Sequence, residues 1–118
     1  MMDTEIERCT QQLLGAIRGS EEYREYVTAR EEIEKLPDQK KAADRYRRKC
    51  YEEQNDTRLN DVEKMRLELS AEREELRLSP AADRYLRAEA VLCRMLRDVS
   101  IRVMNVPDLD IRPLEGLL

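Results

Sequence analysis

Three cysteines are the side chains of this 118-residue sequence that could most readily hold a metal. Thiolates bind zinc or iron–sulfur clusters, and Cys9, Cys50 and Cys93 lie in three different expected helices, so they could converge in the fold. They are about 40 residues apart, with no Cys-x-x-Cys spacing and no disulfide framework, which fits a reducing cytoplasm. Cys9 and Cys50 fall on apolar helix faces, where a free cysteine packs as a small hydrophobe. The sequence therefore favours core cysteines and no bound metal, with a metal or iron–sulfur sensor as an alternative.

The sequence offers little for acid–base catalysis. It contains no histidine, the side chain that most often transfers protons near neutral pH. Carboxylates such as Glu31, Glu32 and Glu34 come in runs that a helix spreads around its circumference. There is no glycine-rich phosphate loop and no metal-ligand spacing. We therefore expect a binding protein, with no catalytic residue and no cofactor.

A basic run between residues 40 and 49 could neutralise phosphates. Its six members are Lys40, Lys41, Arg45, Arg47, Arg48 and Lys49. A helix scatters these side chains over more than one face, and only Tyr46 and Tyr51 could stack on bases. Acidic residues 72–75 come within reach if the helices pack antiparallel. The run is therefore interpreted as a solvated face that pairs with a neighbouring helix, and RNA binding is the alternative function.

Composition indicates one helical domain over residues 1–118. Charged residues make up 41% of the sequence and hydrophobic residues 41%, with only three glycines, as in soluble helical hairpins. The net charge of −4 arises from 22 basic and 26 acidic residues that are interleaved. The N-terminus is neither basic nor apolar, and no stretch has the ~18 apolar residues of a membrane span. A cytoplasmic protein without a membrane partner is expected.

Periodic apolar residues predict two short helices in the first 37 residues. Residues Thr4 to Glu7 match a capping box, in which Thr4 begins the first helix. Its apolar face recurs at spacings of three and four through Ile6, Cys9, Leu13, Ala16 and Ile17. Gly19 is placed to end this helix in the left-handed conformation, and Ser20 to cap the next one. Pro37 ends the second helix.

The stretch from Asp38 to Leu78 is charged and has only thin apolar seams. Of its 41 residues, 13 are apolar and 22 are charged. Asp38 could cap a helix, and residues 54–57 favour a break or kink because Asn, Asp and Thr are good caps and poor helix formers. The sequence leaves open one helical rod of about 60 Å or two shorter helices.

The final helix is the most apolar part of the chain. Ser79 and Pro80 form a helix start, and 16 of the 26 residues from Ala81 to Val106 are apolar. A helix that is apolar on most sides must be buried on most sides, so this hub helix, which extends to about Asn105, should pack against the other helices and a second copy. The candidate interface residues are Tyr85, Leu92, Met95, Leu96, Val99 and Val103. An irregular tail over residues 107–118 follows. The expected fold is an all-α antiparallel bundle or hairpin of four or five helices, with a charged helical rod and an apolar hub.

Two stretches resemble the bacterial YlbF/YmcA family, and especially its YheA-like branch. Residues 16–26 (AIRGSEEYREY) are similar to the first helix junction of the family. Residues 79–89 (SPAADRYLRAE), followed by Leu92 and Leu96, are similar to its C-terminal helix. The similarity extends over roughly residues 4–106, in the same order.

The resemblance implies a small helical protein that oligomerises and acts by binding other proteins. The best-known members join a complex that tunes RNA processing by RNase Y, and thereby competence, biofilm formation and sporulation. Some carry cysteines in a C-terminal tail and are linked to iron–sulfur clusters, but residues 107–118 contain none. The family supplies no catalytic residue. We therefore expect a cytoplasmic, non-catalytic, oligomeric regulator or adaptor with a protein partner that the sequence does not identify.

Overall fold

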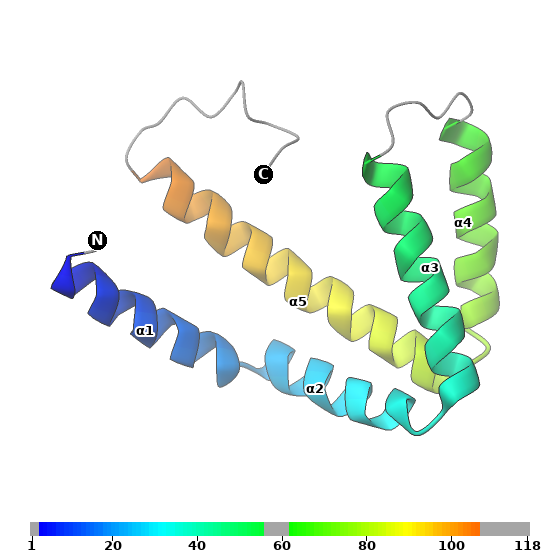
Figure 1. Cartoon of the computed structure of the whole chain (residues 1–118), viewed down its shortest axis with the longest axis horizontal. Helices are drawn as coiled ribbons and strands as arrows, with labels where there is room; N and C mark the ends of the chain where they lie inside the picture. The colour runs from blue at the N-terminus through cyan, green and yellow to red at the C-terminus, as the bar shows by residue number, and fades with distance from the viewer. Residues whose placement is uncertain (1–2, 56–61, 107–118) are drawn as a thin grey trace.

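The computed structural model describes residues 3–55 and 62–106, which form five helices and no strand (Figure 1). The helices are α1 (Thr4–Arg18), α2 (Glu21–Glu34), α3 (Pro37–Asn55), α4 (Val62–Leu76) and α5 (Pro80–Asn105). The predicted all-α fold and the predicted extent of the hub helix, α5, are confirmed. The tail predicted over residues 107–118 lies outside the described residues.

The start of α1 differs from the predicted capping box. Asp3 is the N-cap, and its carboxylate accepts a hydrogen bond of 2.7 Å from the backbone N–H of Glu5. Thr4 is the first helical residue, so the predicted capping box from Thr4 to Glu7 is wrong. Asp and Thr are both good caps, and an Asp at this position also places negative charge at the positive end of the helix dipole.

The turn between α1 and α2 has negative φ angles at both of its residues, Gly19 and Ser20. Gly19 has φ −89°, so the predicted left-handed conformation is wrong. Ser20 explains the difference, because its hydroxyl donates to the Ile17 carbonyl at 2.6 Å and accepts from the Tyr23 N–H at 3.2 Å. One side chain thus closes α1 and caps α2, as predicted for α2, and no left-handed residue is needed to satisfy the end of α1.

Helices α3 and α4 form an antiparallel hairpin (Figure 1). Lys49 of α3 and Glu72 of α4 are 23 residues apart in sequence, yet their charged atoms lie 3.0 Å apart. In one continuous helix they would be about 35 Å apart. The structure therefore has two helices in place of a single rod. Pro37 is the first residue of α3, which corrects the prediction that Asp38 caps it, because proline at this position loses no hydrogen bond.

The core gathers around the first half of α5. This helix contacts α2, α3 and α4, whereas α1 contacts only α2 within the described residues. The buried core residues are Ala29 and Ile33 of α2, Ala43 of α3, Leu69 and Leu76 of α4, and Ala82, Tyr85, Leu86, Ala88 and Leu92 of α5. Tyr85 is 2% exposed and stacks on Tyr26 of α2 with ring centroids 5.9 Å apart. The hub prediction is thus confirmed for this half of the helix.

Ion pairs fix the first turn of α5 to its neighbours. Arg84 pairs with both Glu25 and Glu32 of α2. Asp83 accepts a hydrogen bond of 2.8 Å from Arg73 of α4, and its other oxygen lies 3.0 Å from Arg87. Burial opposes ionisation of Asp83, but the two arginines outweigh that effect and lower the pKa of its carboxyl.

We expect Asp83→Asn to lower the free energy of unfolding by about 1–2 kcal/mol at pH 7, because a charged hydrogen-bond partner of the partly buried Arg73 is lost. The pKa of Asp83 is below its ordinary 3.8 in the folded chain, so its contribution is present above about pH 4. It is lost as the pH falls through the folded-state pKa. Urea titrations of both proteins between pH 7 and pH 3 should show the difference shrinking at the acid end.

Asp98→Asn is the matched control, because Asp98 pairs with Arg102 on an exposed part of the same helix. Its effect on stability should be below about 0.5 kcal/mol. Equal losses in the two variants would contradict the role assigned to Asp83.

Candidate interaction surface

The apolar face of α5 is covered along only half of its length. Of the six predicted interface residues, Tyr85 and Leu92 are buried within the single chain, at 2% and 8% exposure. Met95 and Val99 are half-buried, while Leu96 and Val103 are 38% and 57% exposed. Residues spaced by three, four and seven share one helix face, so all six belong to the same surface. The first part of this face packs in the core, and the second part, on residues 93–105, extends beyond it. We call residues 93–105 the open half of α5.

Further apolar side chains widen this surface. Val91 is 46% exposed and Ile101 is 49% exposed, and neither was among the predicted interface residues. The sequence places Val91 beside the main face and Ile101 behind it. Only the fold shows that the described helices leave both residues about half exposed. The open half of α5 therefore presents apolar groups on several sides.

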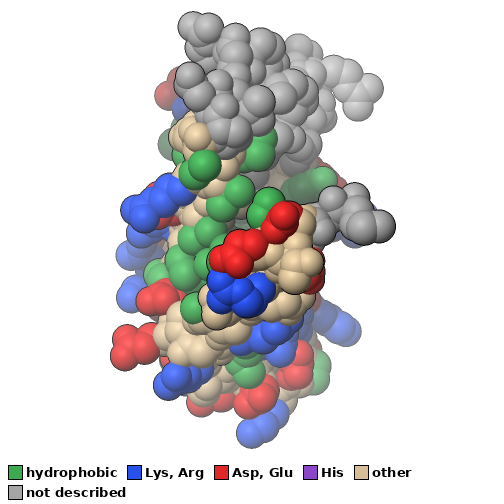
Figure 2. All heavy atoms as spheres, turned by 90° about the vertical axis from the view of Figure 1, so that its left-hand side faces the viewer, with side chains coloured by type: hydrophobic (Ala, Val, Ile, Leu, Met, Phe, Trp, Pro, Cys, Tyr) green, Lys and Arg blue, Asp and Glu red, His purple; other side chains and the backbone are tan. Residues whose placement is uncertain are grey.

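Helix α1 presents a second apolar face that the other described helices leave exposed. None of its residues is buried, and Ile6, Leu13 and Leu14 are 56%, 38% and 36% exposed. Figure 2 looks onto the side where α1 and the open half of α5 lie, and it shows a column of hydrophobic side chains with charged groups along its edge. Single apolar residues on a surface are ordinary, but a contiguous group of them marks a binding surface.

The cysteines are less buried than the sequence predicted. Cys9 and Cys93 are exposed and Cys50 is intermediate, so the prediction of core cysteines is wrong for Cys9 and Cys93. Cys9 is exposed because, among the described residues, α1 packs only against α2, and Cys93 is exposed because it lies on the open half of α5. Cys50 and Cys93 line one cavity of about 490 Å³ between α3 and α5, whereas Cys9 lies on α1 and does not line it.

Tyr46 lies in the same cavity as Cys50 and Cys93. Burial, together with a hydrogen bond to Cys50, raises the pKa of Tyr46 to about 12, so its hydroxyl stays protonated at neutral pH. Among the described residues, no three Cys, Asp or Glu side chains are grouped so that they could hold a metal ion.

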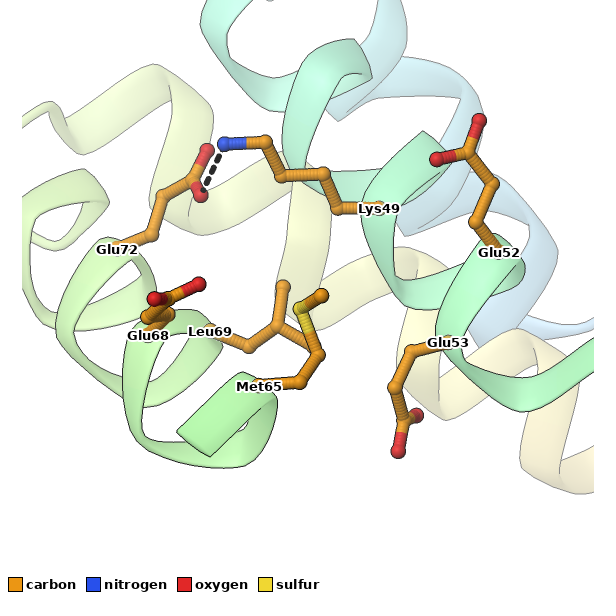
Figure 3. Close-up of a pocket in the computed structure, with 7 residues that line it drawn as sticks. All are labelled: Lys49, Glu52, Glu53, Met65, Glu68, Leu69 and Glu72. Atoms are coloured by element: carbon orange, nitrogen blue, oxygen red, sulfur yellow. Dashed lines mark hydrogen bonds and ion pairs between the residues drawn. The ribbon is translucent and has the colours of Figure 1, made fainter. Parts of the chain in front are cut away.

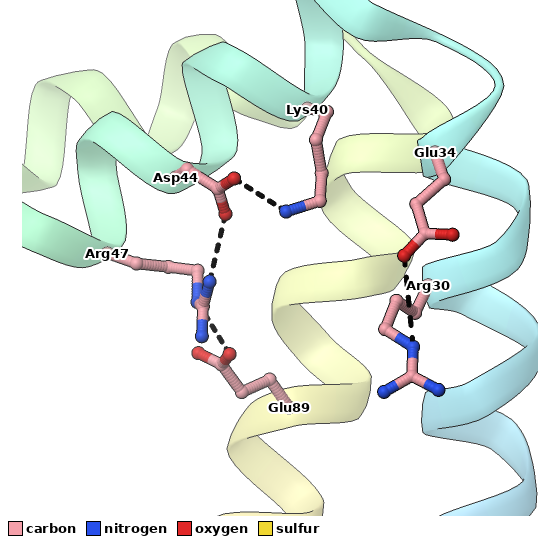
Figure 4. A network of polar contacts seen from close by, with 6 residues as sticks. All are labelled: Arg30, Glu34, Lys40, Asp44, Arg47 and Glu89. Atoms are coloured by element: carbon pink, nitrogen blue, oxygen red, sulfur yellow. Dashed lines mark hydrogen bonds and ion pairs between the residues drawn. The ribbon is translucent and has the colours of Figure 1, made fainter.

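The basic run on α3 is largely engaged in ion pairs. Figure 4 shows Asp44 between Lys40 and Arg47, and Arg47 continuing to Glu89 of α5. Lys49 pairs with Glu72 of α4, which confirms the prediction that the run pairs with a neighbouring helix. Burial opposes ionisation of Asp44, but hydrogen bonds from Lys40 and Arg47 outweigh it and lower the pKa of the carboxyl.

Part of the run also packs on the core. The Lys40 ammonium and the Arg47 guanidinium each lie 5.4 Å from the centre of the Tyr85 ring. The exposed members of the run are Lys41, Arg45, Arg48 and, although it is paired, Lys49. The electrostatic role of the run is therefore mainly to hold α3 against α5.

A second cavity, of about 310 Å³, lies between α3 and α4 (Figure 3). Met65 and Leu69 supply its apolar side chains. Four glutamates and one lysine complete it: Glu52, Glu53, Glu68, Glu72 and Lys49. The sequence does not predict this cavity, because it depends on the chain folding back between α3 and α4. Its excess of carboxylates makes it acidic, and its lining contains no histidine or cysteine.

No helix in the described ranges has the length and apolar character needed to cross a lipid bilayer.

Comparison with known proteins identifies the family of the chain. A family model described as "Control of competence regulator ComK, YlbF/YmcA" matches residues 6–105. Comparisons with curated proteins and with solved structures returned no match. The matched residues span α2 to α5 completely and nearly all of α1, and therefore most of the sequence. The resemblance inferred from residues 16–26 and 79–89 is thus confirmed, and the chain belongs to the YlbF/YmcA family of regulatory proteins.

Proposed function

We propose that the protein is a non-catalytic, oligomeric regulator or adaptor that acts in the cytoplasm through protein–protein contacts. The observation that carries this proposal is the apolar face of α5, which continues from the core onto an exposed surface. A regulatory role follows from the family. The adaptor activity and the oligomer are our inference from the shape and chemistry of the surface.

The open half of α5 has the chemistry of an interface centre. Full burial of a Leu, Val or Ile side chain contributes about 1.5–3 kcal/mol, so side chains that are already half-covered gain roughly 1 kcal/mol each when a partner covers them. Leu96, Ile101 and Val103 are 38%, 49% and 57% exposed. Arg97, Asp98 and Arg102 lie beside them and can form the polar rim of such an interface.

A second copy of the chain is the simplest partner for this face. A two-fold axis lets each chain offer the same set of surfaces to the other, and such symmetric dimers are the commonest homo-oligomers. A protein partner could then bind other faces of the assembly, such as the acidic cavity between α3 and α4. The family suggests a setting in RNA processing or developmental regulation.

Leu96→Glu should dissociate the oligomer, because it places a charge where an apolar contact is made. We expect the weight-average mass in light scattering to fall to that of one 14.0 kDa chain at concentrations where the wild type is larger. Ser70→Glu, which introduces a glutamate at an exposed position of α4 outside this face, is the control and should keep the wild-type mass. A wild type that is monomeric at high micromolar concentration would show that the oligomer proposal is wrong.

RNA binding is the alternative that the exposed basic residues of α3 allow. The change of Lys41, Arg45 and Arg48 to Glu together leaves Arg47 and its ion pairs intact. We expect no RNA binding tighter than about 10 μM at ~150 mM salt in the wild type, since few cations of the run remain for phosphates. Fluorescence anisotropy with one single-stranded and one structured RNA measures this. Submicromolar binding that disappears in the triple variant, with helicity unchanged, would favour the RNA-binding function.

A metal-dependent sensor is the second alternative, and it depends on the three cysteines. Cys9 lies on α1, away from the cavity that Cys50 and Cys93 share. Since zinc sites in proteins use about four ligands, we expect the purified protein to contain no stoichiometric metal. Elemental analysis of protein purified without chelators tests this. One zinc per chain, or iron together with acid-labile sulfide, would refute the expectation, and Cys50→Ala and Cys9→Ala would then identify the ligands.

A further inference from the structure

Helix α1 is the least packed helix of the structure. Its apolar stripe is well formed, yet none of its residues is buried, and among the described residues it contacts α2 alone. In Figure 1, α1 and α5 diverge from the region of α2 like the two arms of a V. A short amphipathic helix gains most of its stability from packing its apolar face. The described part of the chain therefore leaves the stripe on α1 available to a partner surface.

The open half of α5 has the size that such a stripe requires. The 15 residues of α1 extend about 22 Å, and the last 13 of the 26 residues of α5 extend about 20 Å. Both surfaces lie on the side of the molecule seen in Figure 2. Apolar side chains at helical spacings of three, four or seven run along each of them: Ile6, Leu13 and Ile17 on α1, and Leu96, Val99 and Val103 on α5. The two faces thus have similar lengths, and both are apolar.

Interface area favours the participation of α1. A stable interface typically buries ~800 Å² on each partner. One helix face about 20 Å long and about 10 Å wide is roughly a quarter of that in projection. A contact made only by the open halves of two α5 helices would therefore be small. The addition of α1 doubles the surface that each chain contributes.

Charge also favours a contact between α1 and α5 over one between two α5 helices. The open half of α5 contains three arginines and one aspartate, namely Arg94, Arg97, Arg102 and Asp98. The N-terminal part of α1 contains Asp3, Glu5 and Glu7 against Arg8. Opposite net charges attract across an interface, whereas two copies of the α5 segment would repel.

From these observations we infer that two copies of the chain form a dimer in which α1 of each chain packs on the open half of α5 of the other. This inference rests on the proposed oligomeric function and names the element that completes its interface. The dimer would then contain two equivalent α1–α5 contacts, one on each side of its two-fold axis.

Two substitutions of opposite charge test the inference. Leu13→Glu changes the stripe of α1, and Leu96→Lys changes the open half of α5. We expect each variant alone to be monomeric in sedimentation velocity, with association at least tenfold weaker than in the wild type. An equimolar mixture of the two should form heterodimers, because one of the two contacts then has two apolar leucines and the other pairs Glu with Lys. Native mass spectrometry of the mixture, with one chain isotope-labelled, measures the heterodimer.

Controls separate this inference from the proposed function. Gln11→Glu adds the same charge on the opposite side of α1 and should keep the wild-type dimer. Leu13→Glu should retain its helicity in circular dichroism, since α1 contains no buried residue. If Leu96→Lys does not fold, Val103→Lys, at a position 57% exposed, replaces it.

Three results would overturn the inference. A Leu13→Glu variant that remains dimeric while Leu96→Lys dissociates would leave the oligomeric function standing and exclude α1 from the interface. A mixture that stays monomeric would show that α1 does not reach α5 of another chain, as expected if it closes onto α5 of its own. A monomeric wild type would refute both the inference and the oligomeric function.

Discussion

Tyr85 lies where α2, α3 and α5 meet, and its packing determines the arrangement of these three helices. Its ring stacks on Tyr26 of α2, and the cations of Lys40 and Arg47 of α3 lie over it. Burial is the main cause of the raised pKa of Tyr85, so the ring belongs to the apolar core although it bears a hydroxyl. Since these contacts are all made in the first half of α5, they fix one end of the helix and leave its other end to project.

The projection of α5 follows from the lengths of the helices around it. Helix α2 has 14 residues, whereas α5 has 26, so α2 covers only part of the apolar face of α5. The hairpin of α3 and α4 meets α5 near its start, at Asp83 and Glu89. The part of the apolar face of α5 that the described helices leave exposed is the physical basis of the proposed function.

Charged residues also hold the helices in this arrangement through ion pairs. Arg47 joins Asp44 of its own helix to Glu89 of α5, and Lys49 joins α3 to Glu72 of α4. In the sequence the same residues resemble a phosphate-binding run. The fold pairs Arg47 and Lys49 with carboxylates of other helices, which the local sequence does not show.

The helical class, the hub helix, the Ser20 cap and the start of α5 at Pro80 could be predicted from the sequence, because local periodicity, the Ser20 hydroxyl and the backbone of Pro80 determine them. Ser79 precedes α5 as predicted, but its side chain makes no capping hydrogen bond. Local patterns failed where neighbouring residues compete for one role, as Asp3 and Thr4 do at the start of α1. They also could not show that Tyr85 and Leu92 lie in the core while Leu96 and Val103, on the same face, remain exposed. Only the tertiary structure decides that difference, since burial depends on where α2 and the α3–α4 hairpin end along α5, and therefore on contacts between residues far apart in the chain.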